Sequence, residues 1–312
     1  MKFSKIISVG SYLPKNCVVN SALPAHLETS DEWIVSRTGI TQRYIAAENE
    51  LTSDLATEAA KAALKNAGLT SVDAIILATT TPDNTFPATA TAVQKKLGIR
   101  TGFAFDIQAV CSGFVYALAT ADSFIKSGQI KSALVIGAET LTRTLDWNDR
   151  GTCVLFGDGA GAAVVTASDT AGIISSQLHS DGTYYDELYV DGGVSRKSVG
   201  VLKMQGKEVF KHAVSKMSDS IVSILNSNNL TMKDVNWIVP HQANLRIMDA
   251  IAERIGIEKE KVIATVTKHA NTSAATIPLG LDDSWNKFKK GDLIALTALG
   301  GGFTWGSILM RF

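Results

Sequence analysis

Short runs of aliphatic and β-branched residues, separated by polar segments, recur along the chain of 312 residues. Because continuous apolar runs of this kind are typical of strands covered on both faces, we predict a buried strand at each run. The runs occupy residues 74–78, 133–136, 162–165, 237–239 and 293–296. Helical patterns lie between them, over residues 53–67 and from Gly113, Glu208 and Leu245 onward. This alternation predicts an α/β protein with layered sheets and helices.

A weak internal repeat relates two stretches of the chain. Residues 64–80 (LKNAGLTSVDAIILATT) and 225–242 (LNSNNLTMKDVNWIVPHQ) both contain a helix end, a Leu-Thr turn, an acidic residue and a buried strand. The segments ALVIGAET and LIALTALG form a second such pair. Two interpretations remain: a chance likeness of helix–turn–strand units, or a duplicated fold with a ligand site where its halves meet. Duplication would divide the chain near residue 168, into residues 1–168 and 169–312.

The balance of charge restricts the classes of partner. Lys and Arg together number 30, and so do Asp and Glu, so the chain lacks the basic excess that nucleic-acid binding requires. A local basic patch remains compatible with an acidic carrier protein. Three isolated cysteines, Cys17, Cys111 and Cys153, argue against a disulfide framework or a zinc site and are typical of a reducing compartment.

The N-terminal segment MKFSKIISVGSYLP has a short apolar run that is interrupted by Gly10 and Pro14. This pattern indicates a first strand and not a signal peptide. No apolar run approaches the length of a membrane span. We therefore expect a cytoplasmic protein that has neither nucleic acid nor a membrane as its partner.

Cys111 is the first candidate for chemistry. The segment FAFDIQAVCSGFVYALATADSFIK predicts a strand, a turn and then a helix, with Cys111 at or just before the helix N-terminus. The helix dipole and free backbone N–H groups there would favour a thiolate, which is the nucleophilic form of cysteine. Ser112 and Gly113 are small and would let a substrate approach. The alternative is a cysteine that is simply buried in the core.

His241 and Asn271 are two further candidates. His241 directly follows a predicted strand that ends at Pro240, and strand ends in α/β sheets are where ligand chemistry sits. Its imidazole can donate a hydrogen bond or take a proton near neutral pH. Asn271 lies among small residues in KHANTSAATIPLG, where its amide could donate to an oxyanion. The alternatives are a histidine whose hydrogen bonds are all made within a loop, and an asparagine that serves in a turn or as a helix cap.

Two glycine-rich stretches carry weaker signals. GDGAGAAVV, at residues 157–165, contains GxGxG and leads into a strand, so it does not meet the dinucleotide-binding fingerprint. GGGFTWG, at residues 300–306, lies between strand-like runs. It is either a tight hairpin or a place where backbone N–H groups approach a ligand closely.

Taken together, these motifs resemble the β-ketoacyl-[acyl carrier protein] synthase III family of thiolase-like condensing enzymes. The resemblance covers essentially the whole chain, with the motifs in the family's order and at its separations. It is carried by TSDEWIVSRTGI (29–40), VCSGFVYAL (110–118), DRGTCVLFGDGAGAAV (149–164), VPHQANLRI (239–247), HANTSAA (269–275) and GGGFTWGS (300–307). It implies a thiolase-like duplicated fold, layered α/β/α/β/α, with two mixed sheets around buried helices.

The resemblance also implies roles for individual residues. Cys111 matches the acyl-accepting nucleophile, and His241 and Asn271 match the pair that holds the malonyl thioester carbonyl. Gly301 matches a backbone donor that forms an oxyanion hole with the N–H of Cys111. Positions that grip the nucleotide of coenzyme A are matched by Trp33, Arg37 and Arg150, and the pantetheine tunnel by Gly206, Phe210, Ala243 and Asn244. Carrier-protein docking positions are matched by Lys211 and Arg246, and acyl-pocket positions by Phe86, reaching across a dimer interface, and Leu299.

The activity so implied is the first condensation of bacterial type II fatty acid synthesis. A short acyl group, acetyl before others, would pass from acyl-CoA to Cys111 and then react with malonyl-[acyl carrier protein] by decarboxylative Claisen condensation. Coenzyme A would enter as a thioester substrate, with no metal and no resident cofactor. A homodimer is implied as well. Leu299, Val110 and Ser112 depart from residues frequent in the family, which leaves the preferred acyl chain open.

Three rival interpretations remain. A related Cys-His-Asn condensing enzyme or acyltransferase of secondary metabolism would share the same site. A papain-like protease would also have Cys, His and Asn in this order, but the local signature around its cysteine is absent. A non-catalytic member of the fold would be expected to lack one of the three residues.

Overall fold

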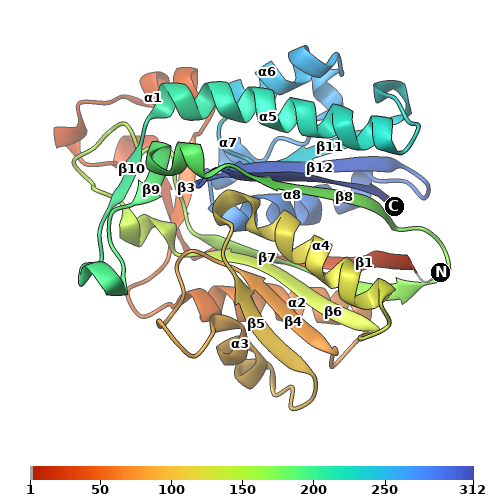
Figure 1. Cartoon of the computed structure of the whole chain (residues 1–312). Coiled ribbons are helices and arrows are strands. Elements are labelled where there is room, and N and C mark those ends of the chain that lie inside the picture. The colour runs from red at the N-terminus through yellow and green to blue at the C-terminus, as the bar shows by residue number, and fades with distance from the viewer. Residues whose placement is uncertain (1–2) are drawn as a thin grey trace.

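Two β-sheets with helices between and outside them make up the protein, whose computed structural model describes residues 3–312. Figure 1 shows five layers: α5 and α6, a four-stranded sheet, α4 and α8, a five-stranded sheet, and α2 with α3. This arrangement confirms the layered α/β/α/β/α fold. The helices are α2 (Thr52–Ala67), α3 (Thr89–Leu97), α4 (Gly113–Lys126), α5 (Gly206–Ser227), α6 (Leu245–Ile255) and α8 (Thr276–Ser284).

Both large sheets are mixed. The five-stranded sheet has the order β1-β7-β6-β4-β5, in which β6, β4 and β5 are parallel and β7 is antiparallel to both of its neighbours. The four-stranded sheet has the order β11-β12-β13-β8, with only β11 and β12 parallel. The strands are β1 (Phe3–Tyr12), β4 (Ala74–Ala78), β5 (Phe103–Ile107), β6 (Ser132–Glu139), β7 (Gly159–Ser168), β8 (Ile173–Ser180), β11 (Trp237–Pro240), β12 (Leu293–Gly300) and β13 (Thr304–Arg311).

Smaller elements lie at one end of these layers (Figure 1). There are two short antiparallel pairs, β2 with β3 and β9 with β10, and β2 and β3 flank the helix α1 in the chain. The short helix α7 lies between α6 and α8 in the chain. Their bounds are β2 (Asn16–Val19), β3 (Gln42–Ile45), β9 (Leu188–Val190), β10 (Leu202–Met204), α1 (Asp31–Thr38) and α7 (Val266–His269). Ser30 begins α1 by accepting a hydrogen bond from the Trp33 N–H, and Gly39 ends it in a left-handed conformation.

The sheet topology supports the duplicated interpretation of the repeat. The order β4-β6-β7-β1 in one sheet has the same strand directions as β11-β12-β13-β8 in the other. The counterpart of β5 is reduced to one parallel bridge between Ile238 and Val262. β7 ends at Ser168 and β8 begins at Ile173, so each large sheet uses strands from one side of residue 168. The two halves share a core, and a division into domains at residue 168 stays a prediction.

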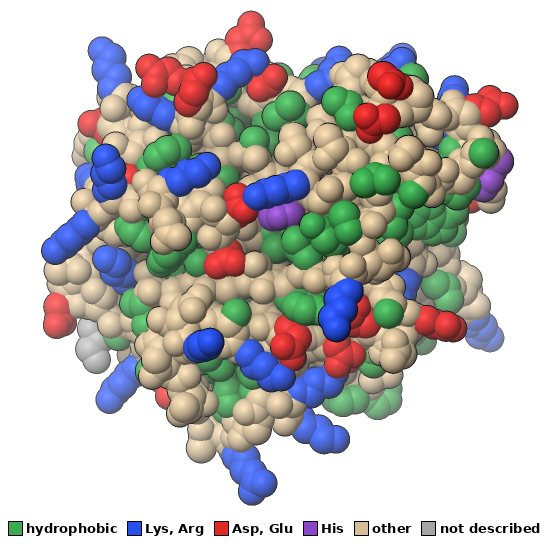
Figure 2. All heavy atoms as spheres, turned by 180° about the vertical axis from the view of Figure 1, so that it is seen from behind, with side chains coloured by type: hydrophobic (Ala, Val, Ile, Leu, Met, Phe, Trp, Pro, Cys, Tyr) green, Lys and Arg blue, Asp and Glu red, His purple; other side chains and the backbone are tan. Residues whose placement is uncertain are grey.

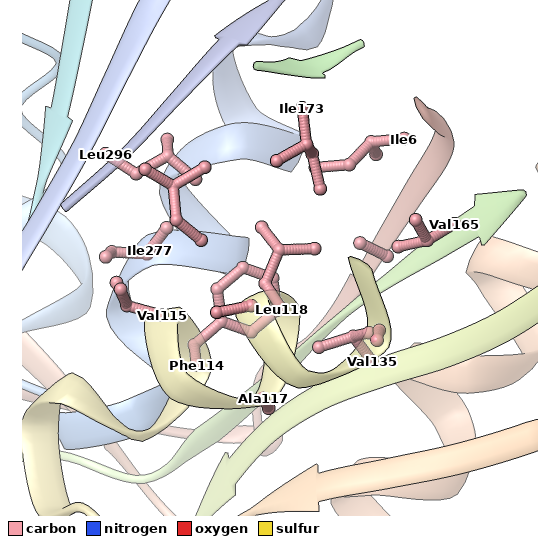
Figure 3. Packing of buried hydrophobic residues seen from close by; sticks show 14 of the residues in the cluster. Ile6, Phe114, Val115, Ala117, Leu118, Val135, Val165, Ile173, Ile277 and Leu296 are labelled. Carbon is pink, nitrogen blue, oxygen red and sulfur yellow. The ribbon is translucent and has the colours of Figure 1, made fainter. Parts of the chain in front are cut away.

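The shared core surrounds α4. Phe114 and Leu118 of this helix are fully buried, and they contact side chains from both sheets and from α8, as Figure 3 shows. Ile6 and Val165 come from one sheet and Leu296 from the other. A helix that is apolar on most of its faces belongs in an interior of this kind. The helix is therefore surrounded by packed side chains, and Cys111 lies directly before its N-terminus.

Acidic and basic side chains alternate over the face shown in Figure 2, with apolar side chains between them. This distribution agrees with the zero formal net charge of the chain.

Across residues 3–312, every helix is either too short or too polar to span a bilayer.

Candidate active site

Cys111 lies in a single 3-10 turn, Val110–Ser112, that joins β5 to α4, which confirms the predicted strand, turn and helix. Its side chain is buried, and it lines two cavities. The end of β12 passes close behind it. A Cβ atom on Gly300 would lie 2.6 Å from the Cys111 nitrogen, so a glycine is required at this close approach.

The protonation of Cys111 differs from the prediction. Burial raises the pKa of its thiol to about 12, although the neighbouring Ser273 hydroxyl acts in the opposite direction. The prediction of a thiolate favoured by the helix N-terminus is therefore not supported, because withdrawal of the sulfur from water raises the pKa of the thiol. The thiol has to give up its proton as it attacks a substrate.

His241 is held at the end of β11 by its backbone and by its neighbour. Its N–H donates to the Thr297 carbonyl of β12 at 2.7 Å. Gln242 is buried and makes four hydrogen bonds, donating to the Pro240 and Ile263 carbonyls and accepting from two backbone N–H groups. These contacts fix the backbone from which the His241 ring projects. Burial lowers the pKa of His241 to about 3, so the ring is neutral at physiological pH.

Asn271 lies just before the 3-10 turn that leads into α8. Its backbone accepts from the Gly157 N–H and donates to the Leu155 carbonyl, each at 3.0 Å. Its side-chain Oδ1 accepts from the Ser273 N–H at 2.9 Å. Because the amide oxygen is used inside the protein, the amide nitrogen is the group that remains for a ligand.

The structure brings Cys111, His241 and Asn271 together around one cavity of about 90 Å³. All three side chains are buried, with at most 6% of their surface exposed. The four residues predicted to line a pantetheine tunnel also line this cavity: Gly206, Phe210, Ala243 and Asn244. The cavity therefore holds a thiol and two polar side chains in a largely apolar wall.

Leu299, predicted for the acyl pocket, lines the smaller cavity beside Cys111. It is buried in a core cluster that contains side chains of both halves, and it lines the 90 Å³ cavity together with His241 and Asn271. Side chains alternate between the two faces of a strand, and at Leu299 the face is the one covered by α5. Its role in the acyl pocket stays a prediction.

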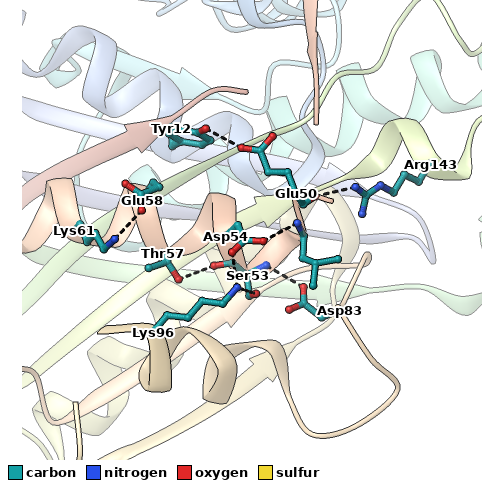
Figure 4. A network of polar contacts seen from close by, with 11 residues as sticks. Tyr12, Glu50, Ser53, Asp54, Thr57, Glu58, Lys61, Asp83, Lys96 and Arg143 are labelled. Atoms are coloured by element: carbon teal, nitrogen blue, oxygen red, sulfur yellow. Dashed lines mark hydrogen bonds and ion pairs between the residues drawn. The ribbon is translucent and has the colours of Figure 1, made fainter. Parts of the chain in front are cut away.

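A larger cavity of about 560 Å³ lies on the other side of Cys111. Gly301 lines it, beside Val110 and Leu141. Figure 4 shows the polar network that holds part of its wall. Arg143 donates to the carbonyl oxygens of residues 47, 48 and 50, and Tyr12 donates to the Glu50 carboxylate at 2.7 Å. The network fixes the loop before α2, whose residues Leu51 and Thr52 face the cavity.

The predicted nucleotide-binding residues form a cluster on the surface. The guanidinium groups of Arg37 and Arg150 lie 4.6 Å and 5.5 Å from the centre of the Trp33 ring. Arg246, at the start of α6, lies 5.9 Å from the centre of the Phe210 ring. α1 and α6 are in contact, so these arginines gather near the end of α5 where Phe210 lines the smaller cavity.

Lys211 is exposed on α5, one residue beyond Phe210. Phe86 is 83% exposed, in the loop that begins with the cavity residues Thr80–Asp83. Neither residue lines a cavity.

Sequence analysis missed three buried residues of the site. Glu139, at the end of β6, accepts hydrogen bonds from the hydroxyl groups of Thr79 and Thr81 and from the Thr80 N–H. Burial raises the pKa of Glu139, and after burial its charge is a further cause of the raised pKa of Cys111. Ser273 and Thr276 are the other two. An acidic residue directly after an apolar run was the available signal for Glu139.

Comparison with known proteins identifies the family. Two family models, 3-oxoacyl-[acyl-carrier-protein] synthase III and its C-terminal part, match residues 105–182 and 225–312. The chain is 58% identical to the beta-ketoacyl-[acyl-carrier-protein] synthase III of Paramagnetospirillum magneticum, over 99% of this chain and 98% of that protein. It is also 58% identical to that of Ehrlichia canis, over the whole length of both.

Solved structures agree. The 3-oxoacyl-[acyl-carrier-protein] synthase III of Aquifex aeolicus superposes with a TM-score of 0.95 at 48% identity, over 99% of this chain and 100% of that one. A priming β-ketosynthase from the R1128 polyketide pathway superposes with a TM-score of 0.94 at 34% identity, over 99% of this chain and 96% of that one. With this agreement over its full length, the chain belongs to the 3-oxoacyl-[acyl-carrier-protein] synthase III family of acyl-transferring condensing enzymes.

Proposed function

We propose that this enzyme initiates bacterial type II fatty acid synthesis by condensing a short acyl-CoA, acetyl-CoA before others, with malonyl-[acyl carrier protein]. The observation that carries the proposal is the position of Cys111 between two unlike cavities. The larger cavity accommodates an acyl chain on Cys111. The smaller one has His241 and Asn271 in its wall and accommodates the thioester end of a pantetheine arm.

In the first half-reaction, Cys111 attacks the acyl-CoA thioester carbon. The tetrahedral intermediate carries its negative charge on the former carbonyl oxygen, where the backbone N–H groups of Cys111 and Gly301 would donate. Collapse breaks the bond to the sulfur of coenzyme A. That sulfur leaves with the proton that Cys111 lost, and the acyl group stays on Cys111 as a thioester.

In the second half-reaction, malonyl-[acyl carrier protein] loses carbon dioxide. The electron pair of the broken C–C bond forms an enolate, whose charge develops on the thioester oxygen between His241 and Asn271. One hydrogen-bond donor at such an oxygen contributes about 3 kcal/mol to the transition state. The enolate carbon then attacks the Cys111 thioester and forms the 3-ketoacyl-[acyl carrier protein]. The sulfur of Cys111 departs as a thiolate and takes up a proton from solvent.

Further parts of the proposal concern binding. Trp33, Arg37 and Arg150 would hold the nucleotide of coenzyme A, because guanidinium groups pair with phosphates and an indole ring stacks on a base. Lys211 and Arg246 would contact an acidic carrier protein. Coenzyme A enters as a substrate, and neither a metal nor a resident cofactor is expected. All three cysteines are free, which is consistent with a cytoplasmic location.

We also propose a homodimer in which Phe86 closes the acyl pocket of the partner subunit. Among the described residues, β5 pairs with β4 on one edge only, so its outer edge is open to a second strand. Phe103 on that strand is 40% exposed and Phe86 is 83% exposed. Light scattering of the purified protein tests this part of the proposal: a monomeric mass would contradict it.

Intact-protein mass spectrometry after incubation with acyl-CoAs tests the reaction. A single acyl increment on the wild type, absent from Cys111→Ala, is expected, and the acyl-CoA that reacts fastest identifies the preferred primer. Cys153→Ala is the matched control, because Cys153 is also buried but lines neither cavity. An increment that persists in Cys111→Ala, or no increment with any acyl-CoA, would overturn the assignment.

A role in secondary metabolism is the second candidate. The polyketide priming enzyme shares the fold but is only 34% identical, against 58% for the synthases named above. A role in secondary metabolism would be distinguished by acylation of Cys111 from a donor other than acyl-CoA.

A further inference from the structure

A hydroxyl group lies between the His241 ring and the peptide of Ser273. The Oγ1 atom of Thr276, in the first turn of α8, is 2.8 Å from Nδ1 of His241 and 2.9 Å from the Ser273 carbonyl oxygen. All three residues are at most 3% exposed, so water does not compete for these contacts. The second ring nitrogen, Nε2, has no hydrogen bond to any residue in the range 3–312, and the ring faces the smaller cavity.

A threonine hydroxyl has one proton, which can be donated to only one of its two neighbours at a time. The Ser273 carbonyl does not depend on it, because that oxygen also accepts from the backbone N–H of Thr276. Nδ1 of His241 has Thr276 as its sole partner within the described chain. Donation from Thr276 to Nδ1 therefore leaves each of these buried groups paired, and it places the single proton of the neutral ring on Nε2.

Asn271 shows the same division of roles. Its Oδ1 accepts from the Ser273 N–H at 2.9 Å, and its amide nitrogen is left for a ligand. Ser273 thus contacts both residues: its N–H donates to Oδ1 of Asn271, and its carbonyl oxygen accepts from the backbone N–H of Thr276. The side chains of His241 and Asn271 each use their acceptor atom inside the protein and keep an N–H donor for the cavity. Two donors that converge on one oxygen are what a developing enolate requires.

We propose that Thr276 is a positioning residue that donates its hydroxyl proton to Nδ1 of His241 and so directs an Nε2–H into the smaller cavity. The inference deepens the proposed function, on which it rests for the identity of the oxygen that accepts this bond. The opposite tautomer, with Nε2 as an acceptor, would make His241 a base for the Cys111 thiol and not a donor to the enolate. The strong depression of the His241 pKa by burial disfavours that role.

Nitrogen NMR of the folded enzyme tests the tautomer without any activity measurement. Protein labelled with ¹⁵N-histidine is recorded near neutral pH, and the His241 signals are assigned by their loss in His241→Gln. We expect a protonated Nε2 and an unprotonated Nδ1 in the wild type and in Thr276→Ser. Thr276→Val, which replaces the hydroxyl by a methyl group, should shift these signals. Protonation at Nδ1 in the wild type would overturn the proposal.

The two half-reactions provide the kinetic test. In Thr276→Val, we expect carbon dioxide release from malonyl-[acyl carrier protein] by the acylated enzyme to fall by about tenfold to a hundredfold, as on loss of an imidazole's orienting partner. The rate of Cys111 acylation should fall much less, and Thr276→Ser should recover most of the lost activity. Thr265→Val is the matched control, because the buried hydroxyl of Thr265 has no hydrogen-bond partner among residues 3–312.

Two kinetic outcomes would contradict the role of Thr276. One is an equal fall of both half-reactions in Thr276→Val. The other is a fall of the same size in Thr265→Val, since either result indicates general damage to packing. Failure of the proposed function looks different: Cys111 would not be acylated at all in the wild type, while the NMR result would still report the tautomer.

Discussion

The two cavities that meet at Cys111 differ in size and in chemistry. The larger, of about 560 Å³, is lined mainly by loops of the first half and by the segment around β9 and β10, and no histidine lines it. The smaller, of about 90 Å³, is lined mainly by the second half and contains His241 and Asn271. In the proposed function, the larger cavity stores the acyl chain and the smaller one stabilises the charge of the enolate. The difference explains how one thiol can serve two successive half-reactions.

The two halves of the fold also differ in the residues that follow equivalent strands. β4 and β11 occupy equivalent positions in the two sheets. The residues after β4 are Thr79–Thr81, whose hydroxyl groups and backbone bind Glu139, whereas the residue after β11 is His241. α4 and α8 are the corresponding central helices, the first preceded by Cys111 and the second by Asn271. The two halves share one arrangement of strands and central helices, and they differ in the chemical groups that follow the strands.

The largest expected effect is on the smaller cavity. His241→Ala or Asn271→Ala should lower malonyl decarboxylation by about a hundredfold to a thousandfold, because each would remove a proposed donor to the enolate oxygen. Acylation of Cys111 from acyl-CoA should change far less. Carbon dioxide release and intact mass measure the two steps separately. Equal losses in both steps would mean that the cavities do not divide the reaction.

The larger cavity can be narrowed with a side chain of greater volume. Leu141→Phe should lower acylation by acyl-CoAs of six or more carbons by about tenfold or more and spare acetyl-CoA, since each excluded methylene contributes about 1–3 kcal/mol. Val209→Phe, in the wall of the smaller cavity, is the counterpart and should impair all acyl-CoAs alike. The same chain-length profile in both variants would contradict the assignment of the two cavities.

Acid should weaken the fold through its buried histidines. Burial lowers the pKa of His241 to about 3 and that of His269 to about 4, so the unfolded chain binds protons that the folded chain does not. The stability from these groups is complete above about pH 6.5 and is lost as the pH falls toward about 4 for His269 and toward about 3 for His241. Each histidine contributes at most about 1.4 kcal/mol per pH unit in this range.

Urea unfolding at several pH values measures this loss. His269→Gln should reduce the slope of stability against pH, because one of the two proton-binding groups is removed. A slope identical to that of the wild type would show that His269 does not titrate as described. Decarboxylation should show no ionisation near pH 6.5, since His241 stays neutral there.

The smallest effect concerns the surface near the smaller cavity. Arg246→Glu should raise the KM for malonyl-[acyl carrier protein] by about threefold to tenfold and leave acyl-CoA use nearly unchanged, because exposed charges act mainly on encounter. The effect should diminish at high salt. Arg254→Glu, at the other end of α6 and paired with Asp219, is the control. An equal change in both variants would place carrier docking elsewhere.

Much of the fold was readable from local pattern. The five apolar runs became β4, β6, β7, β11 and β12, and Cys111 lies in the predicted turn between a strand and a helix. Continuous apolar runs and helical spacing are properties of neighbouring residues, so the sequence displays them directly. The motifs also identified the three residues that meet at the smaller cavity, His241 and Asn271 with Cys111, although nothing in their spacing shows that they meet.

Other features depend on contacts between distant parts of the chain. The packing of two sheets around α4 and α8 decides three of them. It sets the cavity that Leu299 lines, it buries Cys111 and so raises the pKa of its thiol, and it brings the Thr276 hydroxyl next to His241. Desolvation and hydrogen-bond partners are set by what surrounds a residue in space. The sequence by itself determined which groups and elements are available, and the tertiary structure decided their protonation, their orientation and the cavity that each one lines.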